Sequence, residues 1–239
     1  MKCAVDLHLH SCLSPCADDD MTPNNIAGMA YVKQLDCIAV TDHNTALNLP
    51  AVQKVADAMG VVLLPGIEVT SREEVHVLTY FPTVDDAVDF GAMVYEHLPP
   101  LPNNKAIFGN QLILDEEDEV TGELDKLLIQ ATDLSIEEIA RRCERAGGLC
   151  VAAHINRSSN SLLANLGFLP PRPVFAALEV YRAAPAPGVD TGAYKILYAS
   201  DAHRLGDMLE REFFVELPER STEALFGYLK NCRERVRGD

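Results

Sequence analysis

The chain has 239 residues, enough for one large domain with a substantial buried core. Its formal charge of −16 argues against binding to long nucleic acid or to an anionic membrane, because both would be repelled at long range. No apolar stretch approaches the roughly 18 residues needed to span a bilayer, and the first residues, MKCAVDLHLH, do not resemble a signal peptide. We therefore expect a cytoplasmic protein with a small substrate.

The cysteines support the same compartment. There are seven of them, an odd number, and no two form a C-x-x-C pair. This pattern is typical of reduced thiols. Cys12 and Cys16 lie close to the first histidine pair and are alternative ligand candidates, although buried free cysteines are common.

The first eighty residues alternate between strand and helix patterns. CAVDLHLH predicts a strand, after which Thr22 as N-cap and Pro23 at the first helical position predict a helix to about residue 35. DCIAVTDH predicts the next strand, and LPAVQKVADAMG predicts a helix that ends at Gly60. VVLLPGIEVT and EVHVLTYF predict two further strands.

Residues 82–133 interrupt this alternation. They contain LPPLPNN and the acidic stretch LDEEDEVTGELD, which is typical of a solvated loop or hairpin. Long connections in compact domains are often functional. We therefore expect residues 82–133 to be an insertion that partly covers the site, within a single domain of residues 1–239. His97, in an apolar and proline-rich context, is expected to be structural or exposed.

The alternation resumes after residue 133. Ser135 and Glu138 form the S-x-x-E capping box of a helix that ends at the glycine pair 147–148. LCVAAH, ALEVYR, ILYASD and EFFVEL predict strands, and a last helix is expected from Ser221 to about residue 232. Strands that alternate with helices favour an α/β fold with a parallel sheet or barrel.

Histidines and acidic residues gather at the ends of the predicted strands. Six of the seven histidines lie at or near such an end, and HxH and DxH pairs place two side chains on the same side of a strand. In a parallel barrel these ends converge on one face. Imidazole and carboxylate ligands together suit Zn, Mn or Fe. The sequence therefore predicts a metal site formed by His8, His10, His43, Glu68, His76, His154, Asp201 and His203.

The motifs DLHLHS, TDHN, GIEVT, HVL, AAHINR and SDAH, in this order from residue 6 to about residue 215, resemble the PHP family, named for polymerase and histidinol phosphatase. The resemblance implies a distorted (β/α)7 barrel of mostly parallel strands with the metal site at the C-terminal face. It also implies two or three divalent ions, of Zn, Mn, Fe or a mixture.

The resemblance further implies how the ions are shared. One ion would be held by His8, His10, Glu68 and Asp201. Glu68 would bridge to a second ion that is completed by His76 and His154. A third would be held by His43, His203 and an aspartate after the first motif. Counting back from Thr22-Pro23 selects Asp18 as this aspartate, with Asp19 and Asp20 as alternatives.

The implied activity is hydrolysis of a phosphate ester by metal-activated water. Glu68, Asp201 and His203 are the expected catalytic residues, with Asp201 or His203 moving a proton to the leaving group. The expected substrate is a small phosphorylated molecule, such as a nucleotide, a nucleoside bisphosphate or a sugar phosphate. The alternatives are a histidinol-phosphate phosphatase, a nuclease on short oligonucleotides, an amidohydrolase, and a non-catalytic metal-binding regulatory domain.

Several residues next to the ligand positions are candidates for substrate binding. Arg157 follows His154 in HINR, and its planar guanidinium suits a phosphate group. Asp42 is expected to orient a ligand histidine or the local turn. The remaining expected substrate contacts are Asn44, Asn156, Arg182 and Arg204.

Overall fold

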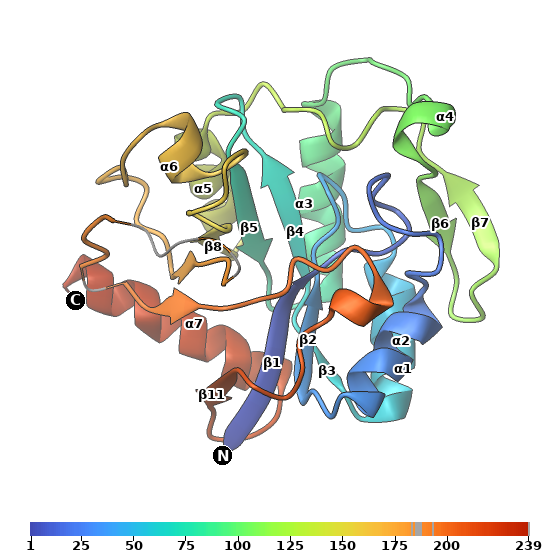
Figure 1. The fold of residues 1–239 in the computed structure, drawn as a ribbon, viewed down its shortest axis with the longest axis horizontal. Coiled ribbons are helices and arrows are strands. Elements are labelled where there is room, and N and C mark those ends of the chain that lie inside the picture. Colours follow the sequence, from blue (N-terminus) through green and yellow to red (C-terminus); the bar gives the residue numbers. More distant parts are fainter. Residues whose placement is uncertain (183, 185–187, 193, 239) are drawn as a thin grey trace.

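The structure is a computed structural model that describes residues 1–239 except 183, 185–187, 193 and 239 (Figure 1). It contains two main sheets and a separate hairpin. Within the described residues, no helix combines the length and the apolar character that crossing a membrane requires.

The first sheet has the strand order β11-β1-β2-β3. Strands β1 (Lys2–Leu9), β2 (Cys37–Val40) and β3 (Val62–Leu63) are parallel, and β11 (Phe214–Glu216) runs antiparallel to β1. The parallel strands are joined by the helices α1 (Pro23–Val32) and α2 (Leu49–Met59), which lie side by side (Figure 1). The sequence predicted both helices: Thr22 caps α1, and Gly60 ends α2 with φ of 70°.

The second sheet has the order β10-β9-β8-β5-β4. Its strands are β4 (Gly66–Thr70), β5 (His76–Tyr80), β8 (Leu149–Ala152), β9 (Leu178–Glu179) and β10 (Ile196–Leu197). Both pairings of β5, with β4 and with β8, are antiparallel, whereas β8-β9 and β9-β10 are parallel. The connecting segments carry α5 (Ile136–Arg145), α6 (Leu162–Asn165) and the 3-10 turn η1 (Leu205–Asp207), and α7 (Thr222–Arg237) follows β11. Ser135 and Glu138 form the predicted capping box of α5.

The expected (β/α)7 barrel is wrong for this structure, because the described strands form separate sheets and none closes on itself. Two consecutive strands that pair in parallel must be joined by a crossover connection of about a dozen residues or more. The link between β4 and β5, residues 71–75, is too short for this and allows only an antiparallel hairpin. The two main sheets are joined by the single bridges Leu9–Ala202 and His43–Glu68.

The two main sheets nevertheless pack against each other. Val5 and Leu7 of the first sheet share a buried apolar cluster with Leu78 and Val151 of the second. Helix α7 covers this cluster with buried leucines, among them Leu225. A larger cluster lies under α1, α2, α5 and a further helix, α3 (Val84–Glu96).

The segment 82–133 has two parts. It begins with α3 (Val84–Glu96), which buries Phe90 and Val94 in the larger core cluster. The rest carries α4 (Lys105–Phe108) and the hairpin of β6 (Leu112–Leu114) and β7 (Val120–Glu123), visible at one side of the molecule (Figure 1). We call residues 97–133 the strap.

Candidate metal centre

The predicted ligands meet where the two main sheets approach each other. His8 lies on β1 and His10 directly after it, His43 follows β2, and Glu68 lies on β4. The bridges Leu9–Ala202 and His43–Glu68 bring these strand ends together with the segment after β10. The set is completed by His76 at the start of β5, His154 after β8, and Asp201 and His203 after β10.

Glu68 is the centre of this group. Its carboxylate is buried and lies within 3.4 Å of nitrogens from five imidazoles. Its Oε1 atom is 2.9 Å from Nδ1 of His76 and 3.2 Å from Nε2 of both His8 and His154. Its Oε2 atom is 3.1 Å from Nδ1 of His43 and 3.4 Å from Nε2 of His10. A single carboxylate thus contacts histidines from four strand ends.

Asp201 is the second carboxylate of the centre. Its Oδ1 atom lies 3.1 Å from Nε2 of His10 and 3.3 Å from Nε2 of His8. Its Oδ2 atom lies 2.6 Å from Nη1 of Arg157. Asp201 has φ of 53° and His154 has φ of 22°, backbone conformations that are costly for residues other than glycine and that concentrate at functional sites.

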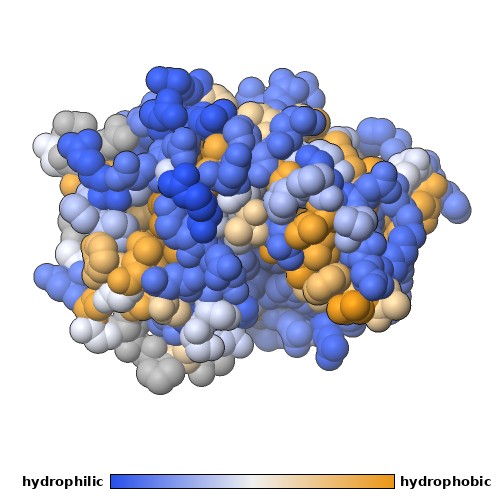
Figure 2. Space-filling model, turned by 90° about the horizontal axis from the view of Figure 1, so that it is seen from above, coloured by the Kyte–Doolittle hydropathy of each residue, from blue (hydrophilic) through white to orange (hydrophobic). Residues whose placement is uncertain are grey.

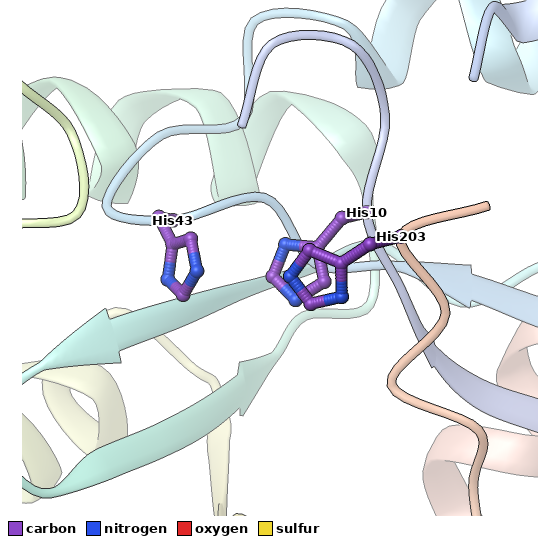
Figure 3. Close-up of side chains that lie close together, drawn as sticks. All are labelled: His10, His43 and His203. Atoms are coloured by element: carbon purple, nitrogen blue, oxygen red, sulfur yellow. The ribbon is translucent and has the colours of Figure 1, made fainter. Parts of the chain in front are cut away.

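Three groups of donor atoms are close enough to share an ion. The first is His8, His10, Glu68 and Asp201, the same four residues that the family resemblance implies for one ion. The second is His43, Glu68 and His76, and the imidazole of His154 also contacts the Glu68 carboxylate. The third is His10, His43 and His203, whose rings lie close together in Figure 3. His10 and His203 stack with their ring centroids 4.2 Å apart.

The hydrogen bonds of His8 and His10 leave their Nε2 atoms free to face an ion. Nδ1 of His8 lies 2.9 Å from Oε2 of Glu179, and a carboxylate can only accept, so Nδ1 carries the proton. Nδ1 of His10 lies 2.9 Å from Oγ of Ser14, which donates its own proton to Oδ1 of Asp42. Both histidines are therefore held with Nε2 toward the carboxylates, the usual orientation behind metal-bound histidines.

The spacing and the donor set fit divalent ions. Two ligand atoms at about 2.1 Å from one ion, separated by roughly 90–110°, lie about 3.0–3.4 Å apart. The contacts of Glu68 and Asp201 with His8, His10 and His43 fall between 3.1 and 3.4 Å. Among the described residues, Nδ1 of His43 and Nδ1 of His76 have no hydrogen-bond partner although they face Glu68. Their lone pairs suit an ion placed between them and the carboxylate.

The electrostatics of the cluster keep the carboxylates charged. Burial alone would raise the pKa of Glu68, but His76, His8 and His43 hold that pKa well below its usual range. Burial alone would lower the pKa of His10, but hydrogen bonds to Asp201 and Glu68 raise it to about 9. Burial lowers the pKa of His203 to about 4, so this imidazole is neutral at pH 7. A metal ion requires ionised carboxylates, and it displaces the proton of His10 when it binds.

The aspartates and cysteines of the first loop lie outside the three groups. The side chain of Asp18 is 54% exposed, and its Oδ2 atom is 3.4 Å from Nε of Arg204. Asp19 accepts a hydrogen bond from the amide of Asn110 instead. Cys12 is buried and Cys16 exposed, and neither belongs to a group of potential ligands among the described residues.

The expected substrate contacts separate into two kinds. Arg157 and Arg182 line a pocket of about 470 Å³ beside Asp201 and His203. By contrast, Asn44 binds the backbone of residues 70, 128 and 130, and Asn156 binds the backbone of Tyr181. These two amides therefore fasten loops. A larger pocket of about 690 Å³, lined by residues of α5, α7 and 171–174, lies away from the histidines.

Three residues of the site escaped the sequence analysis. Glu179 orients His8, Ser14 orients His10, and Tyr181 stacks under Arg157 with the guanidinium 4.3 Å from the ring centroid. Glu179 lies within the predicted strand ALEVYR, as Glu68 lies within the predicted strand VVLLPGIEVT, and an acidic residue inside an apolar strand was a usable signal. Asp42 accepts hydrogen bonds from Ser11 and Ser14, so it shapes the loop after β1 and orients His10 through Ser14.

The chain belongs to the PHP domain family, which matches residues 6–149. This is a family of metal-dependent hydrolases, in agreement with the cluster of imidazoles and carboxylates. No curated protein matches the chain.

Several solved structures share the fold. The lesion-specific endonuclease PfuEndoQ from Pyrococcus furiosus is 22% identical with a TM-score of 0.69, and the match covers 100% of this chain but 56% of the endonuclease. A protein from Bifidobacterium adolescentis described as a metal-dependent phosphoesterase is 18% identical with a TM-score of 0.63. An amidohydrolase from Chromobacterium violaceum, solved with bound sulfate, is 17% identical with a TM-score of 0.61. For the last two, the match covers 96% of both chains.

One comparison corrects the expectation about partners. An endonuclease Q of the same fold, 21% identical with a TM-score of 0.68, has been solved with a 27-mer duplex that has an abasic lesion at the active site. This match covers 57% of the endonuclease chain. The exclusion of long nucleic acid is therefore wrong. Net charge sums over the whole surface, whereas nucleic-acid binding depends on the local charge around the site, which bound cations change.

Proposed function

We propose that this chain hydrolyses phosphate esters at a cluster of two or three divalent ions. The observation that supports this most strongly is the contact of the Glu68 carboxylate with five imidazoles, next to a second carboxylate, Asp201, at the edge of a pocket. When bound, such ions lower the pKa of water and stabilise the charge that develops on a phosphoryl group.

The side chains of the proposed site have distinct tasks. Glu68 and Asp201 supply the negative charge that holds the ions, and His8, His10, His43, His76, His154 and His203 supply neutral nitrogens. Asp18 stays a proposed ligand only if the first loop turns its carboxylate away from Arg204. Oδ2 of Asp201 pairs with Arg157, and both residues line the pocket. In this proposal Asp201 takes a proton from water or returns one to the leaving group.

Arg157 is the proposed contact for the substrate phosphate. Nη1 is bonded to Asp201, and the guanidinium stacks on Tyr181, so the arginine is held rigidly beside the pocket. A planar guanidinium in this position suits a phosphate oxygen. Arg182 lines the same pocket but is paired with Glu212 at 2.9 Å, and Arg204 lies on the surface with Asp18.

The leading substrate class is a small phosphate monoester, such as a nucleotide, a nucleoside bisphosphate or a sugar phosphate. A pocket of about 470 Å³ is large enough for such a molecule. The face toward which β1 and β4 point is mostly hydrophilic, which suits a charged substrate (Figure 2). A second candidate is cleavage of phosphodiesters in nucleic acid, favoured by the fold shared with the endonuclease.

The experiment compares substrates on protein loaded with Mn²⁺ or Zn²⁺. Release of inorganic phosphate from a panel of metabolite phosphates is measured beside cleavage of a diester, of labelled duplex DNA with and without an abasic site, and of amides. The matched control is Glu68→Gln, which keeps the size of the side chain but removes its charge. We expect phosphate release that Glu68→Gln abolishes. Turnover of amides alone, or equal turnover by the variant, would contradict the proposal.

A further inference from the structure

Asp6 is a buried carboxylate of β1 that belongs to none of the three donor groups. Its Oδ1 atom accepts a hydrogen bond of 2.9 Å from the backbone N–H of Ser200. Its Oδ2 atom accepts from Oγ of Ser200 at 2.7 Å and from the backbone N–H of Leu209 at 2.9 Å. All three donors lie in the segment that follows β10, so Asp6 fastens this segment to β1.

The fastened segment carries two proposed ligands, Asp201 and His203. Asp201 follows Ser200 directly and has φ of 53°, a conformation less favourable for an aspartate than for glycine. One further contact comes from the backbone, where His10 N–H donates to the carbonyl of Ala202 at 2.9 Å. Asp6 is the charged group that fixes the residue before Asp201 by both its backbone and its side chain.

We propose that Asp6 is a positioning residue, which holds the segment 200–209 so that Asp201 and His203 reach the ligands on β1. This rests on the proposed function only in taking Asp201 and His203 as ion ligands. The role requires two acceptor oxygens, because one accepts from the Ser200 N–H and the other from Ser200 Oγ and the Leu209 N–H. An asparagine at this position would present an amide N–H toward one of the donors and lose at least one bond to Ser200 or Leu209.

The chain offers a matched control at Asp36, which bonds β1 closer to the start of the strand. Asp36 accepts a hydrogen bond from Ala4 N–H at 2.7 Å and pairs with Arg211 at 2.9 Å and with Arg220 at 3.2 Å. It therefore also ties the start of the chain to the C-terminal region, but it does so through Ala4, which precedes both Asp6 and the histidines on β1. Among the described residues, it makes no hydrogen bond or ion pair with the segment 200–209. A loss of general stability affects both aspartates, whereas a loss of ligand positioning affects only Asp6.

The test measures ion binding directly. Wild type, Asp6→Asn and Asp36→Asn are titrated with Co²⁺, and the bound ions per chain, their affinities and the visible absorption spectrum are recorded, with circular dichroism as the check of folding. We expect Asp6→Asn to bind the ion that contacts Asp201 about tenfold more weakly or not at all, with a changed spectrum, as is typical when groups behind the ligands are altered. Asp36→Asn should match wild type.

The result that would overturn the proposal is wild-type stoichiometry and affinity in Asp6→Asn, or an equal loss in both variants. If Asp6→Asn does not fold, Ser200→Ala, which removes one of the three bonds, is measured with the same two outcomes. Because ion binding is read without any substrate, a failure to hydrolyse phosphate esters would contradict the proposed function and leave this result intact.

Discussion

Nδ1 of His8 lies 2.9 Å from Oε2 of Glu179, and both side chains are buried. The contact links β1 to β9, which belong to different sheets. It assigns the proton of His8 to Nδ1, and Nε2 is left to face Glu68 and Asp201. A glutamate that escaped the sequence analysis thus determines how one of the main proposed ligands is presented.

The first prediction concerns Glu179. Glu179→Ala removes the acceptor for Nδ1 of His8, and we expect metal affinity to fall by about 10- to 100-fold. Glu179→Gln keeps an acceptor oxygen and should show a smaller loss. Competition with a fluorescent chelator gives the affinities. Equal affinities in wild type and Glu179→Ala would show that His8 is oriented by other contacts.

The second prediction is a pH dependence of ion binding. In the metal-free protein, hydrogen bonds to Asp201 and Glu68 outweigh burial and raise the pKa of His10 to about 9. Below this pH an ion must displace a proton from Nε2, so affinity rises with pH up to about 9, by close to tenfold per unit for one proton. Titration calorimetry in two buffers of different ionisation enthalpy counts the protons released. In His10→Ala, this proton release should disappear; a pH-independent affinity in wild type would contradict the assignment.

The third prediction separates substrate binding from ion binding. Arg157→Ala should lower kcat/KM for a phosphate ester by about 10- to 100-fold, the effect of losing a charged hydrogen bond. The number of bound ions should stay unchanged, because Arg157 is not a potential ligand. Arg182→Ala is the comparison: it lines the same pocket, but its guanidinium is paired with Glu212. A larger effect of Arg182→Ala would move the phosphate contact to that residue.

The fourth prediction concerns the strap. Gly109 has φ of 94°, and a Cβ atom there would lie 2.4 Å from the carbonyl oxygen of Pro15, in the loop that follows His10. Gly109→Ala should therefore lower the free energy of unfolding by about 1–3 kcal/mol and weaken ion binding through this loop. Gly122→Ala, whose Cβ meets Ile113 at an ordinary 3.5 Å, is the control within the strap. Urea unfolding and Co²⁺ titration provide the measurements.

The ligands could be predicted from the sequence because a strand exposes alternate residues on one side. His8 and His10 share that side, and Glu68 lies on β4 at the bridge to His43. The pairing of strands could not be predicted in the same way, since every strand pattern fits several partners. The short link of residues 71–75 was a signal of the antiparallel pair β4-β5 that the alternation of strands and helices concealed.

The roles of the amides and of Asp18 depend on contacts between distant segments. Asn44 was a candidate for substrate binding because it follows His43, but its amide donates to the carbonyls of Leu128 and Gln130 in the strap. The sequence around Asn44 does not show which backbone carbonyls of a distant segment will lie beside its amide. Asp18 likewise depends on the path of the first loop, whose Asp18 N–H donates to the carbonyl of His203 at 2.9 Å.

The single bridges between the two main sheets both lie at the metal centre, Leu9–Ala202 on one side and His43–Glu68 on the other. Ions bound there would draw together strand ends that the backbone joins only at isolated points. Removing the ions with a chelator should therefore weaken the contact between the two sheets. Amide hydrogens near both bridges should then exchange with solvent faster, whereas those of α7 should keep their protection. The number of ions bound at the centre would then determine how firmly the two main sheets are held together.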